Sequence, residues 1–347
     1  MLNKLIEPCW EFIHKSQFGF RKQYDTRIAV LNFLNTYNNI KSNNENENNK
    51  TYIIMIDIAK HFDSISFKII RKTIKKFILN KIKQTFLIKY YQGEGLGIFQ
   101  GDPLSPILFA LISHFLLLKI ISLTDHCQMF GDDLILIIKG DKLHLNQKLN
   151  SIYEIIIQFG LKPNKEKTVI SKDLKKIKYL GIYLDKISQI VYNLKKAKET
   201  FNNCKQLFNN NSLNNNLKIR SFKSFILSQL TYGLEKNNYE IKTLNYLNSW
   251  MNTAITEMCK INRNTPILIY KTEFKIENMV ISVNKKKFKF KKKLKNLSLP
   301  YLEKLIKFNQ RTNNKINWNS KDLIELKKEI YKYTYNELLN SKSWKCR

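Results

Sequence analysis

Residues 129–137 read MFGDDLILI and place two adjacent aspartates, Asp132 and Asp133, inside an otherwise apolar run. The apolar segments on either side, CQMF and LILIIK, are typical of two strands joined by a tight turn. Neighbouring carboxylates repel each other, and burying even one of them is costly. We therefore predict a hairpin whose tip presents both carboxylates to a ligand instead of to a core.

A third aspartate belongs to another strand pattern further upstream. The segment TYIIMIDIA (51–59) is apolar and β-branched, which predicts a strand that ends near Asp57. Magnesium takes oxygen ligands, and two such ions about 3.5–4 Å apart stabilise both oxygens of an in-line phosphoryl displacement. An isolated pair of aspartates is more often a turn or surface pair, so the surrounding motifs must decide the function.

The charge balance points to nucleic acid without proving it. The 347 residues contain 60 Lys and Arg against 28 Asp and Glu, a formal net charge of +32. A partner that carries many phosphates explains this excess. An A+T-rich gene would also enrich Lys, Asn and Ile without any selection for binding, so both explanations stay open on composition alone.

Cysteine usage and hydropathy exclude several classes of protein. The five cysteines include no CxxC pair, which argues against a zinc module or a disulfide framework and favours a reducing, intracellular compartment. The longest apolar run, residues 107–123, is interrupted by Ser113, His114 and Lys119. We therefore predict a buried helix there and no membrane span.

Two polar stretches divide the chain. Residues 41–50 (KSNNENENNK) indicate a flexible linker, and residues 208–216 (FNNNSLNNN) a break between helical patterns. From about residue 192 the periodicity is helical. The segment 284–297 (NKKKFKFKKKLKNL) is either a solvated helix face or a nucleic-acid contact surface, and further helical periodicity follows Pro300.

Several motifs occur in a characteristic order between these breaks. The segment IFQGDPLSPILFALISHF (98–115) predicts a loop and then a helix, with Ser105 as N-cap and Pro106 in the first helical position. Together with the strand of Asp57, the FGDD hairpin, FGLKPNKEKT (159–168) and KYLGI (178–182), it resembles the palm of reverse transcriptases, most closely those of LINE-type non-LTR retrotransposons. QFGFRK (17–22) is similar to that family's fingers motif, and SFILSQLTYGLE (224–235) to the segment after its thumb.

The resemblance implies an α+β right-hand polymerase. Its parts would be partial fingers and a linker (1–50), a palm with an antiparallel sheet (51–190), a helical thumb with the following segment (191–280) and a basic helical region (281–347). The implied activity is RNA-directed DNA synthesis by two-metal phosphoryl transfer. The implied partners are an RNA template, a DNA primer and deoxynucleoside triphosphates, with no membrane; oligomeric state stays open.

The resemblance also assigns roles to single residues. Asp57, Asp132 and Asp133 would hold two magnesium ions, although Asp133 could be a supporting acid, and Lys167 would neutralise the leaving pyrophosphate. Phe62 would lie under the sugar and leave no room for a 2′-hydroxyl. The other implied contacts are the nucleotide and template (Gln100, Gly101), the triphosphate (Arg21, Lys22) and the primer grip (Tyr179, Leu180, Gly181). Core packing or simple surface exposure is the alternative for each of them.

The sequence departs from the family in some places, and two other functions stay open. His61 stands where a small residue is usual, Gly131 replaces a commoner alanine, and we find no second fingers motif, endonuclease or Cys/His module. An RNA-dependent RNA polymerase shares the GDD tip, but it would carry an acid five residues after its first metal aspartate, where this chain has Phe62. A non-catalytic RNA-binding relic of a reverse transcriptase is the other alternative.

Overall fold

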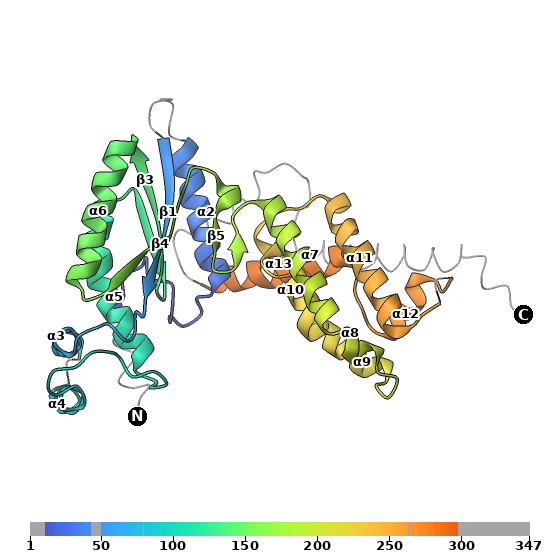
Figure 1. The fold of residues 1–347 in the computed structure, drawn as a ribbon, viewed down its shortest axis with the longest axis horizontal. Helices are drawn as coiled ribbons and strands as arrows, with labels where there is room; N and C mark the ends of the chain where they lie inside the picture. Colours follow the sequence, from blue (N-terminus) through green and yellow to red (C-terminus); the bar gives the residue numbers. More distant parts are fainter. Residues whose placement is uncertain (1–10, 43–49, 79, 263, 298–347) are drawn as a thin grey trace, which may run out of the picture. The chain divides into compact units, whose positions relative to one another are not determined.

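The computed structural model describes residues 11–42, 50–78, 80–262 and 264–297 (Figure 1). The chain divides into two compact units, residues 1–189 and 190–347. The first unit contains a sheet with its covering helices, and the second is helical. The assignment of these units as palm and thumb stays a prediction.

The sheet of the first unit has four strands in the order β2-β3-β1-β4, and every pairing is antiparallel. Its strands are β1 (Lys50–Ala59), β2 (His126–Phe130), β3 (Asp133–Gly140) and β4 (Lys162–Ser171). The α+β class with an antiparallel sheet is therefore confirmed. The strand predicted to end near Asp57 is also confirmed, since β1 ends two residues later at Ala59.

Alternation along the central strands gives the sheet two apolar faces. Ile54, Ile56 and Leu134 join the core cluster on one face, packed with residues of α5 and α6. The buried helix predicted at residues 107–123 is α5, so that prediction is confirmed. The helices of this unit are α2 (Thr26–Ser42), α3 (Phe67–Phe77), α4 (Lys81–Tyr90), α5 (Ser105–Ile121) and α6 (Lys142–Gln158). Among the described helices, none is long and apolar enough to cross a membrane.

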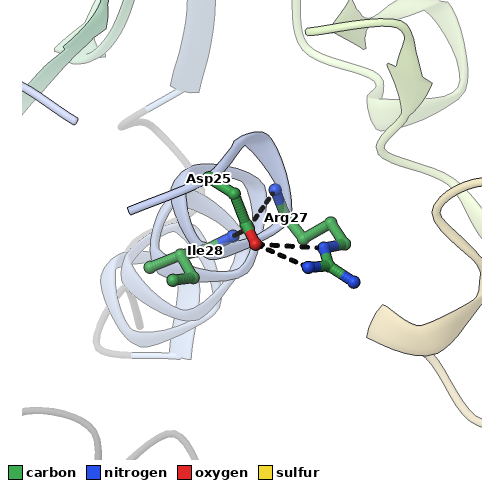
Figure 2. A network of polar contacts seen from close by, with 3 residues as sticks. All are labelled: Asp25, Arg27 and Ile28. Atoms are coloured by element: carbon green, nitrogen blue, oxygen red, sulfur yellow. Dashed lines mark hydrogen bonds and ion pairs between the residues drawn. The ribbon is translucent and has the colours of Figure 1, made fainter. Parts of the chain in front are cut away.

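Helix α2 lies on the other side of the sheet from α6, as Figure 1 shows. The Gln128 amide on β2 donates to the carbonyl of Ala29 and accepts from the Asn32 side chain, each at 2.9 Å. At the start of α2, one Asp25 oxygen accepts from the backbone N–H groups of Arg27 and Ile28, and the other binds the Arg27 guanidinium (Figure 2). This carboxylate caps the first turn of α2.

The start of α5 differs from the sequence prediction. Leu104 is the N-cap and Ser105 the first helical residue, so Pro106 occupies the second position. Ser105 Oγ donates to the Phe99 carbonyl, while Asp102 Oδ1 accepts from the backbone N–H of Leu104 at 2.9 Å. The predicted capping role of Ser105 was therefore wrong, because its hydroxyl ties down the preceding loop instead.

Along the chain, β4 is followed by a 3₁₀ turn η2 (Leu174–Lys176) and a small hairpin of β5 (Lys178–Tyr179) and β6 (Ile182–Tyr183). Helix α7 (Lys186–Asn203) follows and begins six residues earlier than the periodicity suggested. Leu180 and Gly181 form the hairpin turn with φ of 52° and 75°, so they are turn residues and not strand residues.

The second unit is helical, as its periodicity predicted. Its elements are α8 (Lys205–Asn209), α9 (Asn215–Ser221), a π-helical segment η3 (Phe222–Leu227), α10 (Ser228–Leu230), η4 (Leu234–Lys236), α11 (Ile241–Cys259), α12 (Ile267–Glu273) and α13 (Met279–Asn296). The basic segment 284–297 is largely α13. Most of the predicted linker (41–50) and the helical pattern after Pro300 lie outside the described residues.

Candidate active site

The predicted hairpin around the two adjacent aspartates is confirmed. Phe130 at the end of β2 pairs with Asp133 at the start of β3, so Gly131 and Asp132 form a two-residue turn. Gly131 has φ of 63°, a conformation that costs a residue with a Cβ atom about 1–2 kcal/mol. The turn thus places Asp132 at the tip and Asp133 at the first strand position.

Pairing of β1 with β3 brings the third aspartate to the same place. The last registered pair is Ile56 with Leu134, and one further antiparallel step sets Asp57 opposite Asp133. Side chains alternate between faces, so both aspartates lie on the face away from the Ile56 and Leu134 side chains. The Asp57 and Asp132 side chains are 37% and 36% exposed, which leaves them accessible to a ligand.

The surroundings of Asp132 and Asp133 shift the pKa values of these two side chains in opposite directions. Burial, followed by the charges of Asp132 and Asp57, raises the pKa of Asp133 to about 6. Burial also tends to raise the pKa of Asp132, but the hydrogen bond and charge of His61 outweigh it, so this pKa lies below its usual value. The two adjacent aspartates therefore hold their protons with different strength.

Lys167 is brought to Asp57 by an irregularity in β4. The pairing of β1 with β4 shifts register between Met55 and Asp57. Opposite this shift, Asn164 Oδ1 accepts from the backbone N–H of Lys167, and the exposed Lys167 Nζ lies 3.7 Å from Asp57 Oδ2. A cationic group thus stands beside Asp57, and the role predicted for Lys167 at the pyrophosphate stays a prediction.

Phe62 lies among rings next to the aspartates. Its ring centroid is 4.4 Å from that of His61, 5.3 Å from Phe109 on α5 and 6.3 Å from Phe20. The side chain is half-buried and packs against the main core. Phe62 thus packs against Phe109 of α5 and against His61, the residue that contacts Asp132.

The loop before α5 is fastened to the segment that carries Phe62. The backbone N–H of Ile98 donates to the Phe62 carbonyl at 2.7 Å, and Gln100 Nε2 donates to Asp63 Oδ1 at 3.1 Å. Gly101 has φ of 90° and is exposed, and a Cβ atom added to it would meet no other atom within 4 Å. Gln100 therefore contacts Asp63, the residue that follows Phe62 in the sequence.

Residues 16–18 support the aspartate turn, a role that the sequence did not reveal. Phe18 and Met129 on β2 are joined by a backbone hydrogen bond of 2.7 Å, so this segment extends the edge of the sheet. The fully buried Gln17 side chain donates to Ser113 Oγ at 2.9 Å and to the Gly131 carbonyl at 3.3 Å. The only signal in the sequence was the presence of the QFGFRK motif itself.

The other predicted contact residues lie as follows. The Arg21 guanidinium stacks over the Tyr24 ring at 4.7 Å, and Lys22 is exposed. Tyr179 is fully buried, with its ring 6.4 Å from Phe33 of α2, and burial raises its pKa above the usual range. Tyr179 thus anchors the hairpin whose turn is formed by Leu180 and Gly181.

The arrangement of three aspartates at one end of an antiparallel sheet agrees with a comparison with known families. The model of the family described as reverse transcriptase (RNA-dependent DNA polymerase) matches residues 1–184, more than half of the chain. The chain belongs to this family. The resemblance inferred from the motifs is thereby confirmed at the level of the reverse transcriptase family.

A comparison with curated proteins also finds a similar sequence in a retrotransposon. The chain is 29% identical over 140 residues to the retrovirus-related Pol polyprotein from type-2 retrotransposable element R2DM of Drosophila melanogaster. The match covers 33% of this chain and spans 13% of the length of that relative. This non-LTR element agrees with the LINE-type resemblance.

Among solved structures, telomerase is similar. Telomerase from Candida tropicalis, in complex with a TWJ fragment of telomeric RNA, has 15% identity and a TM-score of 0.44 over 90% of this chain and 56% of that one. The corresponding complex from Candida albicans has 14% identity and a TM-score of 0.40, and the match covers 90% of this chain and 57% of the telomerase chain.

Reverse transcriptases generally depend on divalent metal ions, and the donor chemistry here fits such an ion. Within residues 11–42, 50–78, 80–262 and 264–297, no three His, Cys, Asp or Glu side chains converge closely enough to hold a metal ion as they stand. Asp132 Oδ2 lies 2.9 Å from His61 Nδ1, and Asp57 Oδ2 lies 3.7 Å from Lys167 Nζ. Burial first, and then the charges of Asp132 and Asp57, raise the pKa of Asp133, and a bound cation would offset the part that comes from those charges.

Proposed function

We propose that this reverse transcriptase domain is an RNA-directed DNA polymerase of a non-LTR retroelement. It would add deoxynucleotides to the 3′-hydroxyl of a DNA primer along an RNA template. The observation that carries the proposal is the register of β1 with β3, which sets Asp57 opposite Asp133 with Asp132 in the adjoining turn. Membership of the family over residues 1–184 supports the same activity.

The three aspartates would hold two magnesium ions. When bound, these ions supply activation of the primer hydroxyl and stabilisation of charge on the leaving pyrophosphate. Asp57 and Asp133 lie on adjacent strands, so the sheet fixes the spacing of their backbones before any ligand arrives. Such pre-organisation lowers the cost of placing charged ligands around a cation.

The remaining residues would bind and select the substrates. Lys167, 3.7 Å from Asp57, would neutralise charge on the pyrophosphate as it leaves. Phe62 would exclude a ribose 2′-hydroxyl, so that deoxynucleotides are preferred. Contacts to the nucleotide, triphosphate and primer would come from Gln100 and Gly101, from Arg21 and Lys22, and from Tyr179, Leu180 and Gly181.

The test is primer extension by the purified chain on a primed RNA template with magnesium. Asp132→Ala is expected to abolish deoxynucleotide addition and to leave duplex binding intact, because it removes a metal ligand and no basic side chain. The matched control is Glu154→Ala, which removes an exposed carboxylate on α6 and should extend like the wild type. Retained extension by Asp132→Ala would refute the assignment. Preferential use of ribonucleotides by the wild type would favour an RNA polymerase instead.

A further inference from the structure

His61 contacts the carboxylate at the tip of the aspartate hairpin. After β1 ends at Ala59, the backbone N–H groups of Asp63 and Ser64 both donate to the Lys60 carbonyl and form a turn. The turn directs His61 back toward the hairpin, where its Nδ1 lies 2.9 Å from Asp132 Oδ2. This is hydrogen-bonding distance, and the histidine side chain is only 19% exposed.

The imidazole is held in place by rings on two sides. Its centroid is 4.4 Å from that of Phe62 and 5.1 Å from that of Phe109, and those two rings are themselves 5.3 Å apart. Phe109 is fully buried in α5, so it forms a rigid base for the cluster. A ring packed in this way points its Nδ1–H in one direction, which fixes the donor before any ligand binds.

A carboxylate can accept this hydrogen bond and bind a cation at the same time. Each ionised aspartate has two oxygens with about four lone-pair positions, and His61 engages only one oxygen of Asp132. Groups that hydrogen-bond to a metal ligand typically change metal affinity or activity by about 10- to 100-fold.

We propose that His61 is a positioning residue that holds Asp132 by one oxygen and thereby orients its carboxylate for a divalent cation. The proposal rests on the proposed function of the three aspartates. Asp132 lies in a two-residue turn and not within a strand, so the sheet alone does not fix its side chain as it fixes Asp57. His61 supplies that constraint from a different segment of the chain.

Two substitutions separate the hydrogen bond from the ring packing. His61→Phe keeps a ring of similar size between Phe62 and Phe109 but has no donor. His61→Asn loses the ring but keeps an N–H donor close to the position of Nδ1. A purely structural histidine would be replaced better by phenylalanine, whereas a positioning histidine would be replaced better by asparagine.

The measurement is Mn²⁺ binding to the full chain, followed by the electron paramagnetic resonance of free Mn²⁺, at fixed pH and without nucleic acid or nucleotide. We expect His61→Phe to weaken binding by about tenfold or more, and His61→Asn to restore most of the loss. Thermal midpoints of each variant separate lost metal binding from lost folding. Wild-type affinity in His61→Phe, or an asparagine variant no better than the phenylalanine variant, would overturn the proposal.

Asp132→Ala in the same titration distinguishes failure of the inference from failure of the proposed function. If Asp132→Ala removes Mn²⁺ binding and the wild type extends no primer, polymerase activity is refuted while the role of His61 is still measured. If the wild type binds no Mn²⁺, or binds it independently of Asp132, His61 positions no metal ligand and the inference is refuted.

Discussion

At the scale of single residues, the two neighbouring aspartates have different surroundings. Asp132 is paired with His61, whereas burial, and then the charges of Asp132 and Asp57, raise the pKa of Asp133 to about 6. One carboxylate is therefore stabilised in its ionised form by the protein, and the other is destabilised in that form. A divalent cation would remove this second cost, which couples metal binding to stability.

Replacing Asp133 by Asn should stabilise the metal-free protein, and more so at higher pH. The folded-state pKa of about 6 exceeds the ordinary value of 3.8, so the protonated form favours folding below pH 3.8 and this stability is lost as the pH rises through about 6. After discounting for solvent screening, we expect the thermal midpoint to rise by about 2–4 °C at pH 7.5 in EDTA, and by less at pH 4. An equal gain at both pH values would contradict the repulsion.

Shrinking Phe62 should relax the choice of sugar. Phe62→Ala removes the ring that we expect under the deoxyribose, so the preference for deoxynucleotides over ribonucleotides should fall by about tenfold or more. The measurement is the ratio of kcat/KM for one deoxynucleotide and its ribonucleotide in primer extension. An unchanged ratio, with a lower thermal midpoint, would mean that Phe62 only packs against His61 and Phe109.

At the scale of elements, the aspartate hairpin is held from outside its own strands. Residues 16–18 pair with the edge of β2, and Gln17 hydrogen-bonds to the carbonyl of Gly131. An edge strand presents unpaired backbone groups, and this segment satisfies some of them. Gly19 then passes so close that a Cβ atom on it would lie 2.1 Å from the Gly131 nitrogen.

Gly19→Ala should therefore displace the turn that carries Asp132. A backbone atom at 2.1 Å cannot yield without a shift of the chain, and overpacking of this kind costs about 1–3 kcal/mol. We expect a lower midpoint in urea unfolding and a loss of primer extension. Lys15→Ala, which shortens an exposed side chain in the same segment, should unfold like the wild type. An unchanged urea midpoint in Gly19→Ala would contradict this prediction. It would show that the turn at Gly131 moves aside without a cost in stability.

At the scale of the whole molecule, excess positive charge predicts how nucleic acid binds. The formal charge of +32 far exceeds what a few specific contacts require. Phosphate neutralisation releases counterions, so affinity for a duplex falls steeply as salt increases. The proposed catalytic site, by contrast, consists of three carboxylates at one end of one sheet.

Binding of an RNA/DNA duplex should therefore be strongly dependent on salt. With six to ten phosphate contacts, affinity should fall by about 10³- to 10⁵-fold between 50 and 200 mM salt, measured by fluorescence anisotropy. Asp132→Ala should show the same slope, because it keeps every basic side chain. A weak dependence of duplex affinity on salt would contradict this prediction. It would favour the other explanation, in which an A+T-rich gene produces the basic composition without selection for binding.

The sequence by itself determined the fold class, the hairpin around Gly131 and the three aspartates. These follow from local signals: alternation of apolar residues, a glycine in a tight turn, and the order of motifs along the chain. Local patterns did not decide element boundaries, such as the capping of α5 by Leu104 in place of Ser105. The Ser105 hydroxyl is used instead by the Phe99 carbonyl, a partner six residues away that no capping pattern includes.

Only the tertiary structure decided how the aspartates are held. The contact of His61 with Asp132 joins residues 71 positions apart, and that of Gln17 with Gly131 joins residues 114 positions apart. Packing on Phe109 helps to place His61, and pairing with β2 places Gln17, and neither contact leaves a periodic pattern in the sequence. A single chain reveals which residue types are present near a motif. The packing of the sheet and its helices on a common core determines which of these residues come into contact.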